Sequence, residues 1–174
     1  MSRIQSTGSF AHRVTGRVEY VTPKRIIDEL GPFDLDPCAA EVRPWPIAKV
    51  HLTELGLEAR WRGLVFVNPP YGRSNNERAW LERLADHGSG IALIFAKPET
   101  ALWQEVIWPK ADAILFVAGR ISFCNTDGQS TGGHFGPSAL VAFGDKATKR
   151  LDRCKIPGYI VKSPKANHGH KIRP

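Results

Sequence analysis

The chain is most constrained where an apolar run stops at two consecutive prolines. Val65–Val67 has the composition of a buried strand and is followed by Asn68, Pro69, Pro70 and Tyr71. Proline has a fixed φ and no backbone N–H, so two prolines in a row cannot continue the hydrogen-bond ladder of a sheet. The strand must therefore end at Asn68, in a rigid turn. In open α/β sheets, ligands bind beside such carboxyl ends of strands.

This turn combines two hydrogen-bond acceptors with a flat aromatic ring. The side-chain carbonyl of Asn68 and the backbone carbonyl of Pro69 can accept both hydrogens of an exocyclic amine, while Tyr71 stacks on the heterocycle. Accepting both N–H bonds in a tetrahedral arrangement would draw a conjugated nitrogen toward sp³ and direct its lone pair at an electrophile. The residues favour a site for the amine of a base swung out of its stack. The alternative is a proline-rich turn in which Tyr71 only packs.

Composition places the chain among ordinary soluble globular proteins. Its 174 residues are 42% hydrophobic and 24% charged, which suits one domain with a sizeable core. No apolar run approaches the length of a membrane span, and the N-terminus lacks the hydrophobic stretch of a signal peptide. The three widely separated cysteines predict a reducing cytoplasm rather than a disulfide framework. There is no Cys-x-x-Cys pair, and no metal site is expected.

Positive charge is concentrated at the C-terminal end. Residues 1–145 contain 15 Lys and Arg against 16 Asp and Glu, whereas residues 146–174 contain 9 Lys and Arg against Asp152 alone. The net charges are −1 and +8. We therefore predict a basic tail over 146–174 that binds a polyanion, most plausibly nucleic acid. The alternative is a solubilising tail without a partner. Residues 1–17 are polar and aperiodic, which predicts a flexible N-terminus before a folded domain over 18–145.

Hydrophobic periodicity predicts helices alternating with strands. Helices are expected from Thr22-Pro23 to Gly31, from Asn76 to Gly88, and from Pro98 to Pro109. Strands are expected at residues 33–36, 50–52, 64–67, 91–96, 113–117 and 140–143, with a Gly-rich loop over 125–137. This alternation is typical of an α/β fold with a largely parallel sheet.

A second candidate ligand site lies at the end of the strand over residues 33–36. Asp34 and Asp36 are followed by Pro37 and by the small residues at positions 38–40. Carboxylates at a strand end can hold cationic or hydroxyl groups of a ligand. The commoner role of Asp before Pro is to cap a turn or a helix, and that alternative stays open.

Several short motifs occur in one order along the chain: Thr22-Pro23, Phe33-Asp34-Leu35-Asp36-Pro37-Cys38-Ala39, Gly56-Leu57 with Trp61, Asn68-Pro69-Pro70-Tyr71, and Gly119-Arg120-Ile121-Ser122-Phe123. In this order they resemble the phage-type DNA N6-adenine methyltransferase (Dam) family, over roughly residues 19–144. The resemblance implies a pared-down class I methyltransferase fold, a Rossmann-like three-layer sandwich that uses S-adenosylmethionine. It also implies methylation of adenine N6 in double-stranded DNA, with the adenine flipped out.

The resemblance assigns roles to the motif residues. Asn68 and the Pro69 carbonyl would orient N6, Pro70 would shape the turn, and Tyr71 would stack on the adenine. Residues expected at the cofactor are Thr22 and Pro23 at its methionine end, Asp34, Asp36, Pro37 and Cys38 along its edge, and Glu54 as a candidate for the ribose hydroxyls. The wider class usually has a glycine-rich turn after the first acid, and positions 38–40 contain no glycine.

DNA is the expected partner, in the cytoplasm of a bacterium or of a phage-infected host. Base choice is assigned to Arg73, Arg120 and the loop over 125–137. Phosphate contacts are assigned to basic residues of the tail: Lys155, Lys162, Lys165, Lys171 and Arg173. The same motif could instead methylate RNA adenine, cytosine N4 or a protein glutamine, since each presents an NH₂ on a planar group. A non-catalytic nucleic-acid-binding protein on the same scaffold is the remaining alternative.

Overall fold

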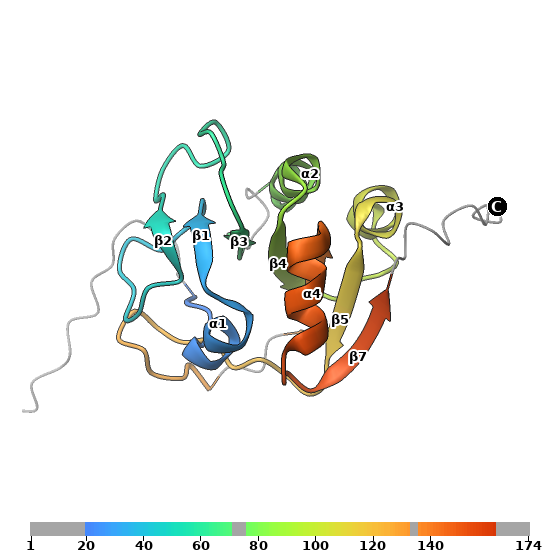
Figure 1. Cartoon of the computed structure of the whole chain (residues 1–174). Helices are drawn as coiled ribbons and strands as arrows, with labels where there is room; N and C mark the ends of the chain where they lie inside the picture. The colour runs from blue at the N-terminus through green and yellow to red at the C-terminus, as the bar shows by residue number, and fades with distance from the viewer. Residues whose placement is uncertain (1–19, 71–75, 133–135, 163–174) are drawn as a thin grey trace, which may run out of the picture.

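One mixed sheet with helices on both faces organises the chain (Figure 1). The computed structural model describes residues 20–70, 76–132 and 136–162. The sheet has seven strands in the order β2-β1-β3-β4-β6-β5-β7. In chain order they are β1 (Phe33–Asp36), β2 (Ala48–His51), β3 (Val65–Val67), β4 (Gly90–Phe95), β5 (Ala113–Val117), β6 (Ser138–Phe143) and β7 (Gly158–Lys162). The six strands expected from periodicity are all confirmed, with small shifts at their ends.

The sheet is parallel in one half and antiparallel in the other. β2, β1, β3 and β4 pair in parallel, whereas β6 runs antiparallel to both of its neighbours and β7 runs antiparallel to β5. The strands β1 to β5 therefore all point the same way, and β6 and β7 run against them. The expectation of a largely parallel sheet holds for strand direction but not for pairing. A continuous apolar run such as Ser138–Phe143 suits a central strand of either direction, so its sequence does not reveal the reversal.

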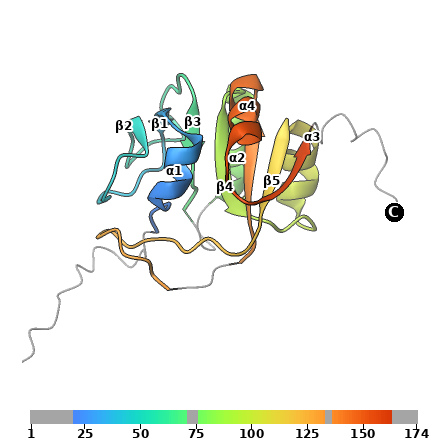
Figure 2. The ribbon, with the colours of Figure 1, turned by 60° about the horizontal axis from the view of Figure 1, so that its bottom comes forward.

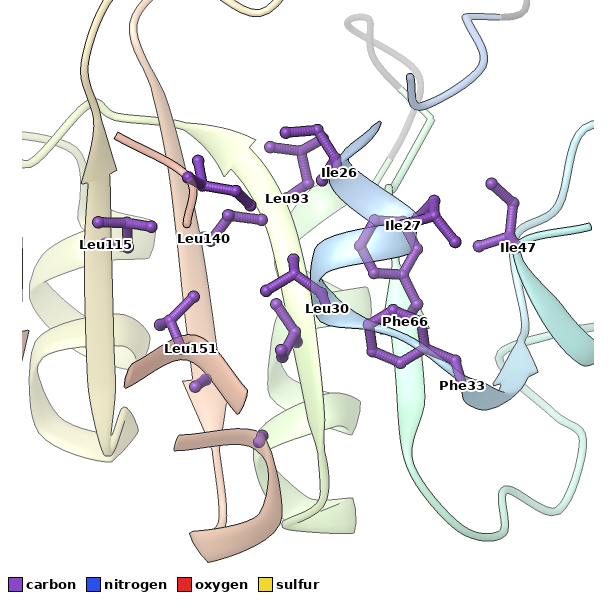
Figure 3. Close-up of a cluster of buried hydrophobic side chains, with 14 of the residues drawn as sticks. Ile26, Ile27, Leu30, Phe33, Ile47, Phe66, Leu93, Leu115, Leu140 and Leu151 are labelled. Atoms are coloured by element: carbon purple, nitrogen blue, oxygen red, sulfur yellow. The ribbon is translucent and has the colours of Figure 1, made fainter. Parts of the chain in front are cut away.

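Helices cover both faces of the sheet, which makes three layers. The helical elements are α1 (Lys24–Leu30), α2 (Glu77–His87), the π-helical turn η1 (Trp103–Ile107), α3 (Trp108–Lys110) and α4 (Asp145–Arg153). α1 and α4 share one buried cluster, in which Ile26 and Leu30 lie near Leu93 and Leu140 (Figure 3). α2 and η1 share the cluster on the other face. None of the described helices is long and apolar enough to cross a membrane.

Most helix ends lie where the capping residues in the sequence predicted them. Asn76 caps α2 by accepting a hydrogen bond from the Ala79 N–H, and Gly88 ends it in the left-handed region at φ 69°. Thr22 was expected to be the N-cap of α1 with Pro23 as its first residue, but Pro23 is the N-cap. The helical segment over 101–110 ends at Lys110, one residue beyond the expected stop at Pro109, and contains the π-helical turn η1.

The C-terminal segment corrects the prediction of a basic arm beginning at residue 146. Residues 145–153 form α4, whose Ala147 and Leu151 are buried, and β7 pairs with β5 along its whole length. Arg150 donates to the backbone carbonyls of Leu30 and Gly31, which ties α4 to the end of α1. The sequence prediction followed the positive charge of this segment. The structure instead follows its apolar residues, which lie on one side of a helix and are buried. Residues 163–174 lie outside the described part of the chain.

The order of the strands creates a crevice between β1 and β3. β2 lies on one side of β1, and β3 and β4 lie on the other, so the chain reverses its direction of travel across the sheet at this point. Ligands of open α/β sheets bind at such a switch point, outside the carboxyl ends of the strands. The connection that follows β5 crosses this edge of the sheet toward α1 (Figure 2). There Val21 and Cys124 exchange backbone hydrogen bonds of 2.9 and 3.0 Å.

Candidate active site

A cavity of about 520 Å³ opens at the carboxyl ends of β1 and β3. Its volume falls within the range of roughly 300–1,000 Å³ that is typical of small-molecule sites. The walls come from the segment over 20–22, the turns over 36–40 and 68–70, and the loop over 53–57, with Trp80 from α2. The structure thus brings together most of the described residues that were expected at the site: Thr22, Asp36, Pro37, Cys38, Glu54, Asn68, Pro69 and Pro70.

The Asn68 turn lies directly after the three buried valine and phenylalanine residues of β3. The side-chain Nδ2 of Asn68 donates to the backbone carbonyl of Tyr20 at 3.4 Å. Since the amide is planar, this contact places Oδ1 on the side of the group that points away from Tyr20. Pro69 is buried, and the next residue is again proline. The turn therefore presents an oriented side-chain carbonyl beside a conformationally restricted backbone carbonyl. Tyr71 and Arg73 lie outside the described residues.

Cys38 links this turn to the turn after β1. Its Sγ donates to the backbone carbonyl of Asn68 at 3.3 Å, and its backbone N–H donates to Oδ1 of Asp36 at 3.2 Å. Burial raises the pKa of the Cys38 thiol well above its usual value, and the Asp36 carboxylate raises it further. The side chain therefore stays a neutral thiol, which keeps its proton available as a donor.

Asp36 is a buried carboxyl group at the cavity wall, with only 5% of the residue exposed. Burial raises the pKa of Asp36 to about 7, and the hydrogen bond from the Cys38 N–H and the charge of Arg43 offset part of that rise. Arg43 also lines the cavity and donates to the Ala40 carbonyl at 2.7 Å. The sequence analysis missed Arg43, because no pattern marks an arginine seven residues beyond the acid.

Asp34 does not reach the cavity. The N–H groups of Asp34 and Leu35 both donate to the Leu64 carbonyl, at 2.8 and 3.4 Å, which is the two-against-one pairing of a β-bulge. The Asp34 carboxylate instead accepts from Lys49 at 2.8 Å and from the Leu64 N–H at 2.8 Å. These contacts, with Lys49 first, lower the pKa of Asp34. The bulge separates two acids that a regular strand would place on one face.

The segment over 20–22 is held from two sides. Trp45 donates its indole N–H to the Thr22 carbonyl at 3.0 Å, and Val21 pairs with Cys124 from the connection after β5. Thr22 is buried at the cavity wall, and Pro23 follows it as the N-cap of α1. Trp45 is a further residue that sequence reasoning missed.

The described residues that were assigned to DNA do not form one patch, because Arg120 and Lys155 lie beyond the end of the β5/β7 pair where Val117 meets Gly158, and Lys162 lies at its other end. Arg120 is exposed in the turn after β5, and Lys155 is exposed after α4. Lys162 pairs with Ala113, the first residue of β5, so it lies at the edge of the sheet opposite the cavity. Its ammonium forms a 2.5 Å salt bridge with Asp152. Lys165, Lys171 and Arg173 fall beyond the described part of the chain, and no His, Cys, Asp or Glu cluster within it is arranged to hold a metal ion.

The fold and the cavity define a three-layer α/β protein with a small-molecule-sized site at the carboxyl edge of its sheet. A family model described as DNA N-6-adenine-methyltransferase (Dam) matches residues 14–171, and the chain belongs to this family. The resemblance expected from the motifs is therefore confirmed, and it extends beyond residues 19–144 at both ends. Membership indicates a DNA adenine-N6 methyltransferase. Searches of curated proteins and of solved structures found no match.

Proposed function

We propose that this protein transfers a methyl group from S-adenosylmethionine to N6 of an adenine that has been swung out of double-stranded DNA. One observation carries the proposal: the Asn68 turn and the buried Asp36 line the same cavity at a switch point of the sheet. The acceptors of the Asn68 turn suit an amine that is to be methylated, and the Asp36 carboxyl group suits a positively charged cofactor. The finer assignment to the class I methyltransferase fold rests on the same arrangement.

The residues present fit S-adenosylmethionine. Burial raises the pKa of Asp36 to about 7, so the site holds a carboxyl group whose charge a cationic ligand would stabilise. When bound, S-adenosylmethionine supplies a methyl group on a positively charged sulfur. Thr22 and Pro23 would border its methionine end, Asp36, Pro37 and Cys38 would line its edge, and the exposed Glu54 at the cavity mouth would reach the ribose hydroxyls. Asp34 has no place in this set.

The chain's own residues contribute orientation of the amine. Oδ1 of Asn68 and the carbonyl of Pro69 would each accept one N6 hydrogen, which makes the lone pair available for in-line attack. Tyr71 would stack on the ring, and Pro70 would keep the turn rigid. Fixing the two reactants in one cavity converts an encounter into an effectively unimolecular step. The proton then leaves the methylated nitrogen. This reaction would take place in the cytoplasm of a bacterium or of a phage-infected host.

The test has two parts. Calorimetry should show that the protein binds S-adenosylmethionine, and failure to bind would indicate a non-catalytic protein on this scaffold. Labelled methyl transfer should then be compared on double-stranded DNA, RNA and a glutamine-containing peptide, followed by mapping of the modified bases. The expected product is N6-methyladenine in DNA. Methylation of cytosine N4, of RNA or of the peptide alone would overturn the assigned substrate while preserving the role of the Asn68 turn.

A further inference from the structure

We propose that Cys38 is a positioning residue for methyl transfer, because its thiol holds the peptide group between Asn68 and Pro69. This inference rests on the proposed function and deepens it. Cys38 also lines the proposed cofactor site, but its thiol proton is donated to the Asn68 carbonyl and not to either reactant. Its effect is on the direction in which the Pro69 carbonyl points.

The contact joins two turns that are distant in the sequence and have no covalent cross-link between them. Cys38 follows β1 and Asn68 follows β3, strands that pair in parallel through Leu35 and Val65. The Sγ of Cys38 lies 3.3 Å from the Asn68 carbonyl oxygen, and the Cys38 N–H lies 3.2 Å from Oδ1 of Asp36. One residue therefore connects the proposed cofactor acid with the turn that would hold the amine.

The geometry of proline transmits this contact to the next carbonyl. The Asn68 carbonyl lies in the same rigid peptide plane as the nitrogen of Pro69. The ring of Pro69 fixes its φ, and the following Pro70 restricts the ψ of Pro69 to extended values. A hydrogen bond that fixes the Asn68 carbonyl thus limits where the Pro69 carbonyl can point. In most sequences two freely rotating dihedrals would absorb the constraint.

The second tether of the turn acts on a different group. The Tyr20 carbonyl accepts from the side-chain amide of Asn68, whereas the Cys38 thiol acts on the Asn68 backbone. The two proposed acceptors are therefore positioned separately, Oδ1 through Tyr20 and the Pro69 carbonyl through Cys38. The first tether uses the Asn68 amide that is itself a proposed acceptor group, whereas the second can be removed by substituting Cys38 without changing either acceptor.

Cys38→Ala and Cys38→Ser make a matched pair for the test. The two side chains are similar in size, but only serine keeps a hydrogen-bond donor. Loss of one neutral hydrogen bond from the turn should lower kcat of Cys38→Ala by about 2- to 10-fold at saturating cofactor. Cys38→Ser should recover at least part of that loss, and DNA affinity should be unchanged in both. Cys154→Ala is the control, because this thiol donates to the Leu151 carbonyl at 3.2 Å, away from the cavity.

A spectroscopic measurement tests the contact without any reaction. A thiol that donates a hydrogen bond has an S–H stretching band at lower frequency than a free thiol. The Raman difference between wild type and Cys38→Ser should isolate a lowered band, even if the alanine variant is too unstable to assay. A band at the frequency of a free thiol, or equal kcat for Cys38→Ala and Cys38→Ser, would overturn the inference. If wild type and Cys154→Ala both fail to methylate DNA, the proposed function fails instead.

Discussion

Gly56 lies directly against the backbone carbonyl of Pro37. A Cβ added at position 56 would lie 1.7 Å from that oxygen and 2.9 Å from Cη2 of Trp80, so only glycine fits. The Trp61 indole holds the same turn by donating to the Gly56 carbonyl at 2.7 Å. The turn after β1 contains no glycine, and the close approach at this corner of the cavity is supplied by a glycine from the loop after β2. The Gly56-Leu57 and Trp61 motif is thereby explained as packing.

Gly56→Ala is expected to displace the loop over 53–57 from the cavity wall. Overpacking costs about 1–3 kcal/mol of unfolding free energy, and this contact is with backbone, which yields less than a flexible side chain. Denaturant unfolding should show the loss, and affinity for S-adenosylmethionine should fall with it. Gly136→Ala is the control, because its Cβ would meet Phe95 at an ordinary 3.4 Å. Equal stability of the two variants would contradict the packing role.

The positions of site residues were predictable where they depend on covalent geometry and on strand direction. Two prolines after Val67 end a strand in any context, and an acid at the end of β1 reaches the same edge when the strands are parallel. The sequence indicated two candidate sites at strand ends, one at Asn68 and one at Asp36, and the cavity contains both residues. Helix ends at Asn76 and Gly88 were equally predictable, because capping is a local interaction.

The rest of the site depends on contacts between distant segments. The bulge at Asp34 arises from pairing with Leu64, and nothing in the sequence of β1 shows it. Arg43 and Trp45 lie in a connection without regular periodicity, so their positions follow only from the folded chain. The basic character of α4 concealed a buried stripe of Ala147 and Leu151. At Asp34 and in α4, tertiary packing overrode the local signal that the prediction used.

Asn68→Ala should abolish methyl transfer while cofactor binding survives. Loss of an acceptor at the reacting nitrogen is expected to lower the rate by about 10²–10³-fold. Asn68→Asp keeps an acceptor but loses the donor to the Tyr20 carbonyl, so an intermediate rate is expected. Single-turnover rates with calorimetric affinities measure both effects. The control is Asn76→Ala, which changes another cavity asparagine but removes only the cap of α2. Near-wild-type turnover of Asn68→Ala would contradict the mechanism.

Stability should depend on pH through Asp36 in a direction unusual for a carboxylate. Burial raises its pKa from 3.8 to about 7, so the folded protein retains a proton that the unfolded chain has lost. The contribution of Asp36 to stability is therefore full below pH 3.8 and is lost as pH rises through about 7. Asp36→Asn should remove this dependence. Unfolding free energies of wild type and variant, compared between these pH values, should converge toward acid and diverge toward neutral pH.

Asp34→Asn is the matched control for that titration. Hydrogen bonding to Lys49 lowers the pKa of Asp34, so its contribution is present above 3.8 and is lost as pH falls through the folded-state pKa. The two acids, two residues apart, should thus show opposite signs. A cationic cofactor should also bind more weakly below about pH 7, where Asp36 is protonated. If the Asp36→Asn and wild-type curves are parallel, Asp36 does not titrate in this range.

Tyr71→Ala should weaken both catalysis and the capture of an extrahelical base, whereas Tyr71→Phe should be nearly silent. Stacking uses the face of the ring and is worth about 1–3 kcal/mol per base. A fluorescent adenine analogue at the target position would report capture directly, with Tyr159→Ala as a control at an exposed tyrosine on β7. Equal fluorescence from wild type and Tyr71→Ala would remove Tyr71 from the stacking role.

Deletion of residues 163–174 should weaken general DNA affinity without changing which sites are methylated. The deletion removes Lys165, Lys171 and Arg173 but leaves β7 paired with β5, whereas a cut before Gly158 would remove a strand of the sheet. For every phosphate that the shortened chain no longer binds, the log–log salt dependence of binding should flatten by about one unit. Phosphate contacts position a protein but do not read bases, so the pattern of methylated adenines should stay the same.

Binding titrations across a salt series measure the slope, and Lys162→Ala controls for charge, because this lysine lies in a salt bridge with Asp152. An unchanged slope would exclude these three residues from phosphate binding, and an altered methylation pattern would assign them to base recognition.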